Sequence, residues 1–299
     1  MIVSEFPRNL RAWRGLIIPM ALLLVWDVGV TALYFNDATH FEAVDIQFTL
    51  FGTVIALFVG FMVNASYARW WEARTLWGQV VDSSRSLARQ SLVLIDQDGT
   101  GSVAGLSEQI VRNQIAYVHV LRTELRHQPL PPEAERYLTP YALAAVTAAG
   151  NKANAILLDT DRLVARAQAE SRLGELPRLS LSTTFATLTD AQGGLERIER
   201  TPLPIQYRFL PRFSSRAFCL ILPFAVVEDL GWATPVGSGL VGLMFLLAVQ
   251  IGDQLARPFA DDIFDVPMTT ISRSVEIDLN QMIGGHAPSP VKPVAEVLY

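Results

Sequence analysis

The sequence predicts an all-α membrane protein whose subunit crosses the membrane four times. Its mean hydropathy is +0.29, and lysine and arginine are absent between Arg14 and Arg69 and again between Arg216 and Arg257. Each gap is long enough for two helical crossings of about 20 residues. The middle of each gap carries acidic residues and no basic ones. These observations predict two membrane hairpins joined by a more polar, helical cytosolic region.

The four crossings are expected in the apolar stretches of the two gaps. The first gap contains residues 15–33 and 46–65, and the second contains 217–227 and 236–252. The stretch 217–227 is too short to cross the hydrocarbon core alone, so we expect its helix to start earlier, near Pro204. A soluble protein with two buried helical hairpins is the alternative.

The charges at the edges of the gaps predict the orientation. By the positive-inside rule, both termini and the middle region face the cytoplasm, and both hairpin tips face outward. The protein is therefore expected in the cell (inner) membrane as a multi-pass protein. The arginines are Arg8, Arg11, Arg14, Arg69, Arg74, Arg208, Arg212, Arg216 and Arg257, and the acidic loop residues are Asp37, Glu42, Asp45, Glu228 and Asp229.

Four segments follow along the chain. They are an N-terminal segment with two membrane helices (1–65), a helical cytosolic region (66–215), the third and fourth membrane helices (216–256) and a C-terminal cytosolic acidic segment with a tail (257–299). In the cytosolic region, apolar periodicity predicts helices. One continues the second crossing without a break to Ile95, the residues 96–102 interrupt it, and further helices are expected over 103–127, 132–138, 143–169 and 181–199.

Catalytic and cofactor chemistry is not predicted. One cysteine, Cys219, excludes a disulfide framework and multi-thiolate metal sites. The four histidines lack metal-ligand spacing, and His119 is expected to be a buried structural residue. Gly237, Gly239 and Gly242 form a GxGxxG string without a preceding strand, so close helix packing is favoured over dinucleotide binding. The formal net charge of -5 argues against nucleic acid as a partner.

Two sets of acidic residues leave alternatives open. Asp27 lies in the middle of the first crossing, where a helix–helix hydrogen bond and a role in an ion pathway are equally compatible with the sequence. After the fourth crossing, a run of acids accompanies Gln254 and could offer oxygen ligands to a hard cation. A solvated surface or pairing with arginines is favoured for that run, which consists of Asp253, Asp261, Asp262 and Asp265.

Thr53, Leu57 and Phe61 recur every four residues on the second crossing. They therefore share one face of a helix. If several copies surrounded an axis, the stripe would form stacked rings, and apolar rings can gate water and ions by dewetting. From spacing alone, ordinary packing or lipid contact is favoured.

Three blocks of the sequence resemble the signature of bacterial bestrophin homologues. The first block joins Gly60-Phe61 with residues 66–74 and 76–78, and the second joins residues 188–190, 192–193, 196–198 and 201–204. The third contains Asp253, Pro258-Phe259 and the following acids, and residues 277–279. The resemblance covers nearly the whole chain.

The resemblance implies a homopentameric, passive ion channel in which the second membrane helices surround a narrow apolar neck. By the Gly60-Phe61 match, the neck positions are Thr53, Leu57 and Phe61. Thr53 departs from the family, which has a larger apolar residue there, and its hydroxyl is expected to make that ring wider and wetter. The resemblance also implies a cytosolic constriction, for which Leu176 is the expected residue.

Animal members of the family bind calcium in a clasp after the fourth crossing. The matching positions include Gln254, Asp262 and Asp265, but Arg257 places a fixed cation among them. We therefore expect no tight calcium activation. Ion preference stays open, since animal members conduct chloride and a bacterial type favours monovalent cations. A membrane-anchored scaffold or sensor without ion flux is the main alternative, and a secondary transporter is disfavoured because no inverted repeat is detectable.

Overall fold

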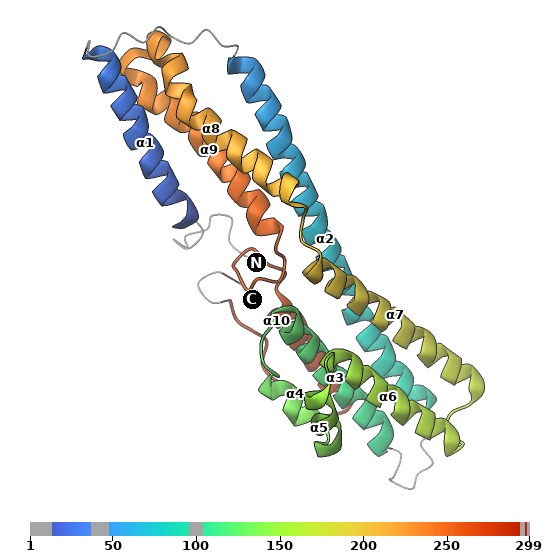
Figure 1. The fold of residues 1–299 in the computed structure, drawn as a ribbon. Coiled ribbons are helices and arrows are strands. Elements are labelled where there is room, and N and C mark those ends of the chain that lie inside the picture. The colour runs from blue at the N-terminus through green and yellow to red at the C-terminus, as the bar shows by residue number, and fades with distance from the viewer. Residues whose placement is uncertain (1–13, 37–47, 96–103, 294–296, 298–299) are drawn as a thin grey trace. The chain divides into compact units, whose positions relative to one another are not determined.

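The computed structural model describes residues 14–36, 48–95, 104–293 and 297. Every secondary-structure element in this part of the chain is a helix (Figure 1), which confirms the predicted all-α class. The chain forms two compact units. Unit 1 contains Trp71–Thr201 and Phe259–Tyr299, and unit 2 contains Ser4–Trp70 and Pro202–Pro258.

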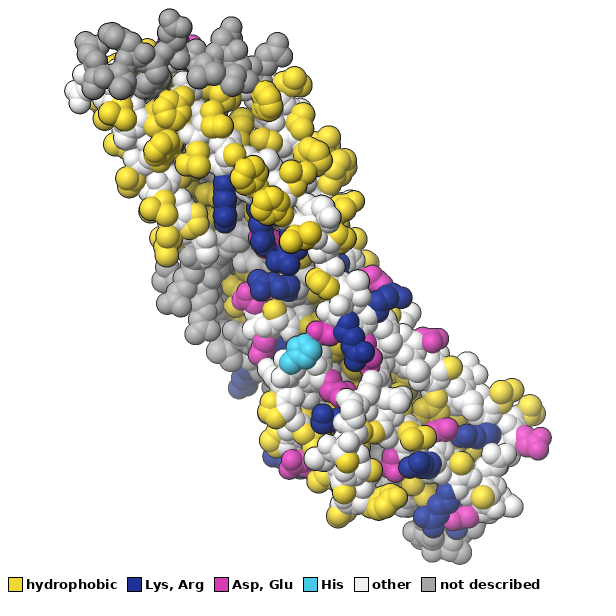
Figure 2. Space-filling view, in the orientation of Figure 1, with side chains coloured by type: hydrophobic (Ala, Val, Ile, Leu, Met, Phe, Trp, Pro, Cys, Tyr) yellow, Lys and Arg dark blue, Asp and Glu magenta, His cyan; other side chains and the backbone are white. Residues whose placement is uncertain are grey.

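Unit 2 contains the long apolar helices. They are α1 (Arg14–Phe35), the first half of α2 (Phe48–Leu94), α8 (Ile205–Leu230) and α9 (Thr234–Leu255). Among the described residues, three stretches are long and apolar enough to cross a membrane: Gly15–Phe35, Phe48–Leu94 and Ile205–Leu255. Apolar side chains dominate the visible surface of this unit (Figure 2).

The third apolar stretch is a helical hairpin. It consists of α8 and α9, joined by a 3₁₀ turn (Gly231–Ala233). Gly231 ends α8 with a φ of 53°, a conformation that glycine adopts without steric cost. The start of α8 at Ile205, directly after Pro204, confirms that this helix begins well before residue 217.

Helices α2, α8 and α9 share an apolar core. Ile55, Val59 and Met62 of α2 pack with Phe218 and Leu222 of α8, and Val249 of α9 completes the cluster. Helix α1 packs against α8 and α9.

Glycines allow α1 and α9 to approach closely. A Cβ atom at Gly239 would lie 2.8 Å from Leu24 Cδ2, and one at Gly242 would clash with Leu23 Cδ2. Both leucines belong to α1. The close helix packing predicted for the glycine string is thereby confirmed.

Unit 1 is built around α3 (Ala104–Leu125). Ile110, Ile115 and Tyr117 of this helix are fully buried, and α3 contacts most of the other helices of the unit. The remaining helices are the second half of α2, α4 (Pro132–Tyr137), α5 (Pro140–Ala148), α6 (Lys152–Ala169), α7 (Glu175–Arg200) and α10 (Met268–Met282).

Several predicted boundaries in unit 1 need correction. The single helix expected over 143–169 is two helices, because Asn151 caps α6 by accepting a hydrogen bond from the Asn154 amide at 2.9 Å. Helix α7 begins at Glu175, earlier than the expected 181, and α10 lies where no helix was predicted. The predicted interruption over 96–102 lies outside the described residues.

Helix α2 is continuous over its 47 residues. The sequence lacks proline and glycine between Phe61 and Trp77, which removes the usual causes of a kink. The expectation that the second apolar helix continues without a break into the polar region is confirmed.

Candidate functional site

The predicted neck residues lie on the side of α2 that faces away from the core of unit 2. Ile55 and Met62 are buried in that core, whereas the Leu57 and Phe61 side chains are 55% and 54% exposed. Since a helix turns by about 100° per residue, Leu57 lies roughly opposite Ile55. Within one chain, the described residues thus leave this apolar stripe uncovered.

Thr53 continues the same stripe and is exposed. Its hydroxyl donates a hydrogen bond to the Thr49 carbonyl of its own helix at 2.7 Å. The donor is therefore satisfied within α2, and the outward surface of Thr53 consists of its methyl group and the remaining lone pair of the oxygen. The surface that Thr53 presents is therefore more polar than that of Leu57 or Phe61. It is less polar than that of a threonine whose hydroxyl has no hydrogen-bond partner.

A groove lies beside the stripe, between α2 and α9. It has a volume of about 640 Å³ and is lined mainly by apolar side chains, including Val59, Val63 and Phe245. Gly60 is at its edge, and a Cβ atom added there would meet nothing within 4 Å among the described residues. Contacts with the described residues therefore do not explain why this position is glycine.

Leu176, the predicted constriction residue, lies in the first turn of α7 in unit 1. Its side chain is 81% exposed, and Leu179, one turn further, is 65% exposed. Both leucines present apolar surface that no described residue of their own unit covers. The family resemblance selected Leu176 from the stretch 174–179. Because α7 begins at Glu175, Leu179 lies beside Leu176 on the helix surface.

The acidic run pairs with arginines. Asp253 forms an ion pair with Arg212, and Asp261 forms one with Arg126 at 2.9 Å. The favoured alternative, pairing with arginines, is confirmed for these two residues. Among the described residues, no group of three histidine, cysteine or acidic side chains is arranged to hold a metal ion.

Asp265 is turned inward. Its side chain accepts a hydrogen bond from the Asp262 amide at 2.9 Å, and the residue is only 2% exposed. Burial raises the pKa of this carboxyl to about 6. Gln254 belongs to α9 in unit 2 and the two aspartates to unit 1, so the cation clasp of Gln254, Asp262 and Asp265 stays a prediction.

Asp27 takes part in a helix–helix hydrogen bond. Ser238 of α9 donates to its carboxylate at 2.7 Å, and Asp27 is fully buried. One of the two readings left open by the sequence is thereby observed. Cys219 is buried, as predicted.

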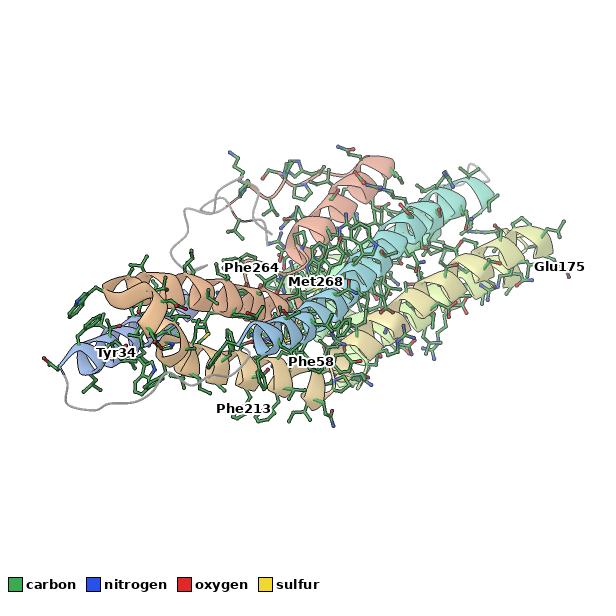
Figure 3. The ribbon with its side chains drawn as sticks, turned by 90° about the horizontal axis from the view of Figure 1, so that it is seen from above. Tyr34, Phe58, Glu175, Phe213, Phe264 and Met268 are labelled. Atoms are coloured by element: carbon green, nitrogen blue, oxygen red, sulfur yellow. The ribbon has the colours of Figure 1, made fainter. Side chains whose placement is uncertain are left out.

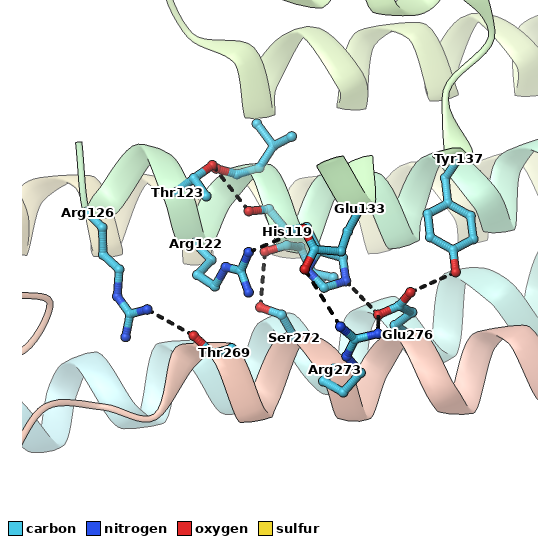
Figure 4. Close-up of polar contacts among 12 residues, drawn as sticks. His119, Arg122, Thr123, Arg126, Glu133, Tyr137, Thr269, Ser272, Arg273 and Glu276 are labelled. Carbon is cyan, nitrogen blue, oxygen red and sulfur yellow. Dashed lines mark hydrogen bonds and ion pairs between the residues drawn. The ribbon is translucent and has the colours of Figure 1, made fainter. Parts of the chain in front are cut away.

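A buried polar network joins α3 to α10 (Figure 4). His119 Nε2 lies 3.0 Å from Glu276 Oε2, Tyr137 donates to Glu276 Oε1 at 2.8 Å, and Arg273 pairs with the same carboxylate at 2.9 Å. His119 is fully buried, which confirms its predicted structural position. The sequence analysis did not pair His119 with Glu276. The two residues lie 157 positions apart, and no local sequence pattern predicts a contact over that distance.

Comparison with known proteins decides the family. A family model described as bacterial and fungal bestrophin proteins matches residues 3–281. The chain belongs to the bestrophin family. The predicted family resemblance is thereby confirmed, and the protein is a membrane protein of this family.

Bestrophin relatives and structures are similar to the chain over most of its length. A Salmonella typhi protein named voltage-dependent anion channel-forming protein YneE is 37% identical over 79% of this chain and 75% of its own. The Escherichia coli K12 protein of that name is 34% identical over 92% of this chain and 90% of its own. A crystal structure of a bacterial bestrophin homologue from Klebsiella pneumoniae aligns with a TM-score of 0.82 at 27% identity, covering 90% of this chain and 99% of that one.

Proposed function

We propose that the protein is a passive channel for monovalent ions that assembles as a homopentamer. The observation that carries the proposal is the uncovered stripe of Thr53, Leu57 and Phe61 on α2 in a chain of the bestrophin family. One such stripe cannot enclose a pore, whereas five copies around an axis would stack into apolar rings. Such rings pass ions only when they are wetted.

The open groove beside Gly60 supports assembly through α2. An exposed glycine inside a helix costs roughly 1 kcal/mol relative to alanine, and no contact within the described chain requires it. Close approach of a neighbouring subunit would use the space that a side chain at this position would fill. The exposed Leu176 is proposed to line a second constriction in the cytosolic region.

The membrane topology belongs to the same proposal. Four crossings follow if α1, the first half of α2, α8 and α9 each span the bilayer. Both termini and the segments 66–215 and 257–299 then lie in the cytoplasm of a cell with an inner membrane. The arginines at the ends of these helices support this orientation.

Ion selectivity is tested by the reversal potential of purified protein in bilayers under a sodium chloride gradient. The names of the relatives favour anions, so we expect a potential near the chloride limit. A potential near the sodium limit would instead identify a cation channel, in which acidic residues at the mouth concentrate cations.

The neck assignment is tested by truncating its rings. Leu57→Ala and Phe61→Ala should raise the single-channel conductance or the open probability, because a wider and less apolar ring wets more readily. Phe51→Ala is the matched control, since Phe51 lies on α2 off the stripe and is similarly exposed, at 56%. Absence of current in the wild type and in both neck variants would favour a membrane-anchored scaffold or sensor.

A further inference from the structure

Three arginines recur along the first half of α8. Arg208, Arg212 and Arg216 are spaced by four residues and therefore form one stripe of the helix. Arg212 is neutralised by Asp253 of α9. For Arg208 and Arg216, no ion pair or hydrogen bond to another described residue occurs, and the Arg208 Nε atom is buried without a hydrogen-bond partner. Among the described residues, two of the three positive charges are thus unbalanced.

The hairpin of α8 and α9 gives the depth of this stripe. With a rise of about 1.5 Å per residue, Arg212 lies roughly 27 Å along α8 from its end at Leu230. This length approaches the roughly 30 Å thickness of the hydrocarbon core. If the hairpin turn lies at one edge of the hydrocarbon core, as in the proposed topology, the Arg212–Asp253 pair lies close to the opposite edge. Arg208 lies one turn beyond that edge, and Arg216 lies one turn inside it.

The neighbours of Arg216 are exposed and apolar. Phe213 precedes it by three residues and Leu220 follows it by four, so both adjoin it on the helix surface. Phe213 is 60% exposed and Leu220 is 48% exposed. Phe213 projects outward from α8 (Figure 3), and its ring stacks on that of Phe209 at 5.7 Å. Lys and Arg side chains border the apolar surface of the unit (Figure 2).

An unpaired guanidinium at this depth needs an anionic partner that can reach the edge of the hydrocarbon core. A phosphate group suits it, because guanidinium donors bind phosphate oxygens in pairs. Free phosphate would not approach the apolar surface of Phe213 and Leu220, whereas a phospholipid brings its acyl chains together with its phosphate.

We propose that Arg208 and Arg216 bind the phosphate headgroup of an anionic phospholipid, whose acyl chains lie along Phe213 and Leu220. The proposal depends on the membrane position of α8 and is independent of the pore. A lipid at this site would hold the polar end of α8 at the membrane edge.

The test compares lipid binding by the full-length wild type and by the variant Arg208→Gln/Arg216→Gln in detergent. Phosphatidylglycerol and, for comparison, phosphatidylcholine are titrated, and native mass spectrometry counts the bound lipids. A basic residue at a membrane surface contributes about 1 kcal/mol to the attraction of anionic lipid, so each removal should weaken phosphatidylglycerol binding roughly fivefold. Arg89→Gln is the matched control, because Arg89 is an exposed arginine in unit 1. It should leave the titration unchanged.

Two further measurements separate the alternatives. The variant Arg208→Lys/Arg216→Lys keeps both charges and should retain most of the phosphatidylglycerol binding. It keeps the proposal testable if the glutamine variant fails to fold. Inorganic phosphate should not compete with phosphatidylglycerol. Equal lipid binding by the wild type and the glutamine variant would overturn the proposal, as would effective competition by inorganic phosphate. A changed reversal potential with intact lipid binding in Arg216→Gln would likewise overturn it and assign this arginine to the ion path.

Discussion

Ser238 on α9 donates a hydrogen bond to the carboxylate of Asp27 on α1, with the two oxygens 2.7 Å apart and both residues buried. The residues are 211 positions apart in the chain. The bond satisfies one oxygen of the only acidic residue in α1 and connects the first apolar helix to the last one.

Ser238→Ala should therefore loosen α1 from α9. Hydrogen bonds between membrane helices contribute about 0.6–2 kcal/mol, so we expect a lower melting temperature in detergent. Ser214→Ala is the control, because the Ser214 hydroxyl donates within α8, to the Leu210 carbonyl. Equal melting temperatures for the two variants would mean that the Ser238 bond does not stabilise the protein.

Gly242→Ala should destabilise the same helix pair by sterics. The added methyl group would clash with Leu23 of α1, and overpacking of this kind costs about 1–3 kcal/mol. Gly29→Ala, also in an apolar helix, adds a methyl group that meets nothing within 4 Å among the described residues. Thermal unfolding should distinguish the two, and a Gly242→Ala protein as stable as the wild type would contradict the close packing of α1 against α9.

Thr53→Ile should narrow and dry the outer ring of the proposed neck. Isoleucine enlarges the side chain and removes the hydroxyl, and both changes favour dewetting, so conductance should fall. Thr53→Val keeps the shape of threonine and isolates the effect of the hydroxyl, which already donates to Thr49. If Thr53→Ile leaves conductance and gating unchanged in bilayer recordings, Thr53 does not line the neck.

Asp265 should make the stability of the protein depend on pH. Burial raises its pKa from 3.8 to about 6, so between these values the folded state holds a proton that the unfolded chain has lost. The free energy of unfolding should therefore fall as pH rises through this window, by at most about 3 kcal/mol. Above about pH 6, the protein is destabilised by the full cost of ionising the buried Asp265 carboxyl.

The Asp265→Asn side chain keeps an oxygen that can accept a hydrogen bond from the Asp262 amide, but the side chain cannot ionise. The variant should be more stable than the wild type at pH 7.5 and similar to it near pH 4, as measured by thermal unfolding at each pH. A wild type whose stability relative to Asp265→Asn does not vary with pH would contradict the raised pKa.

Glu276→Ala should detach α10 from α3. It would leave His119 without its hydrogen-bond partner, the Tyr137 hydroxyl without the acceptor of its proton and Arg273 without its closest carboxylate. Tyr137 would keep only the hydrogen bond that it accepts from Asn280. Breaking a buried ion pair costs about 3–5 kcal/mol. Asp278→Ala removes the partner of Arg85 at an exposed position, which should cost at most about 1 kcal/mol. Hydrogen exchange in α10 should rise sharply only in the first variant.

Local patterns were sufficient for the apolar helices. The absence of basic residues from 15–68 predicted the positions of α1 and the start of α2, because apolar stretches of this length are typical of membrane helices. The uninterrupted run from Phe61 to Trp77 predicted the continuity of α2. The break between α5 and α6 was not predicted. A helix cap depends on a single side chain, here that of Asn151, and the apolar periodicity of a long window does not reveal it.

The all-α class, the family and the stripe of Thr53, Leu57 and Phe61 could be predicted without coordinates, since each depends on the order and spacing of residues along the chain. The partners of the isolated polar residues became known only from the packing of the helices: Ser238 for Asp27, Glu276 for His119 and Arg212 for Asp253. The same packing leaves Arg208 and Arg216 without an ion pair or hydrogen bond to another described residue. Such pairs form between helices distant in the chain, where the energy of burying a polar group depends on what the other helix presents.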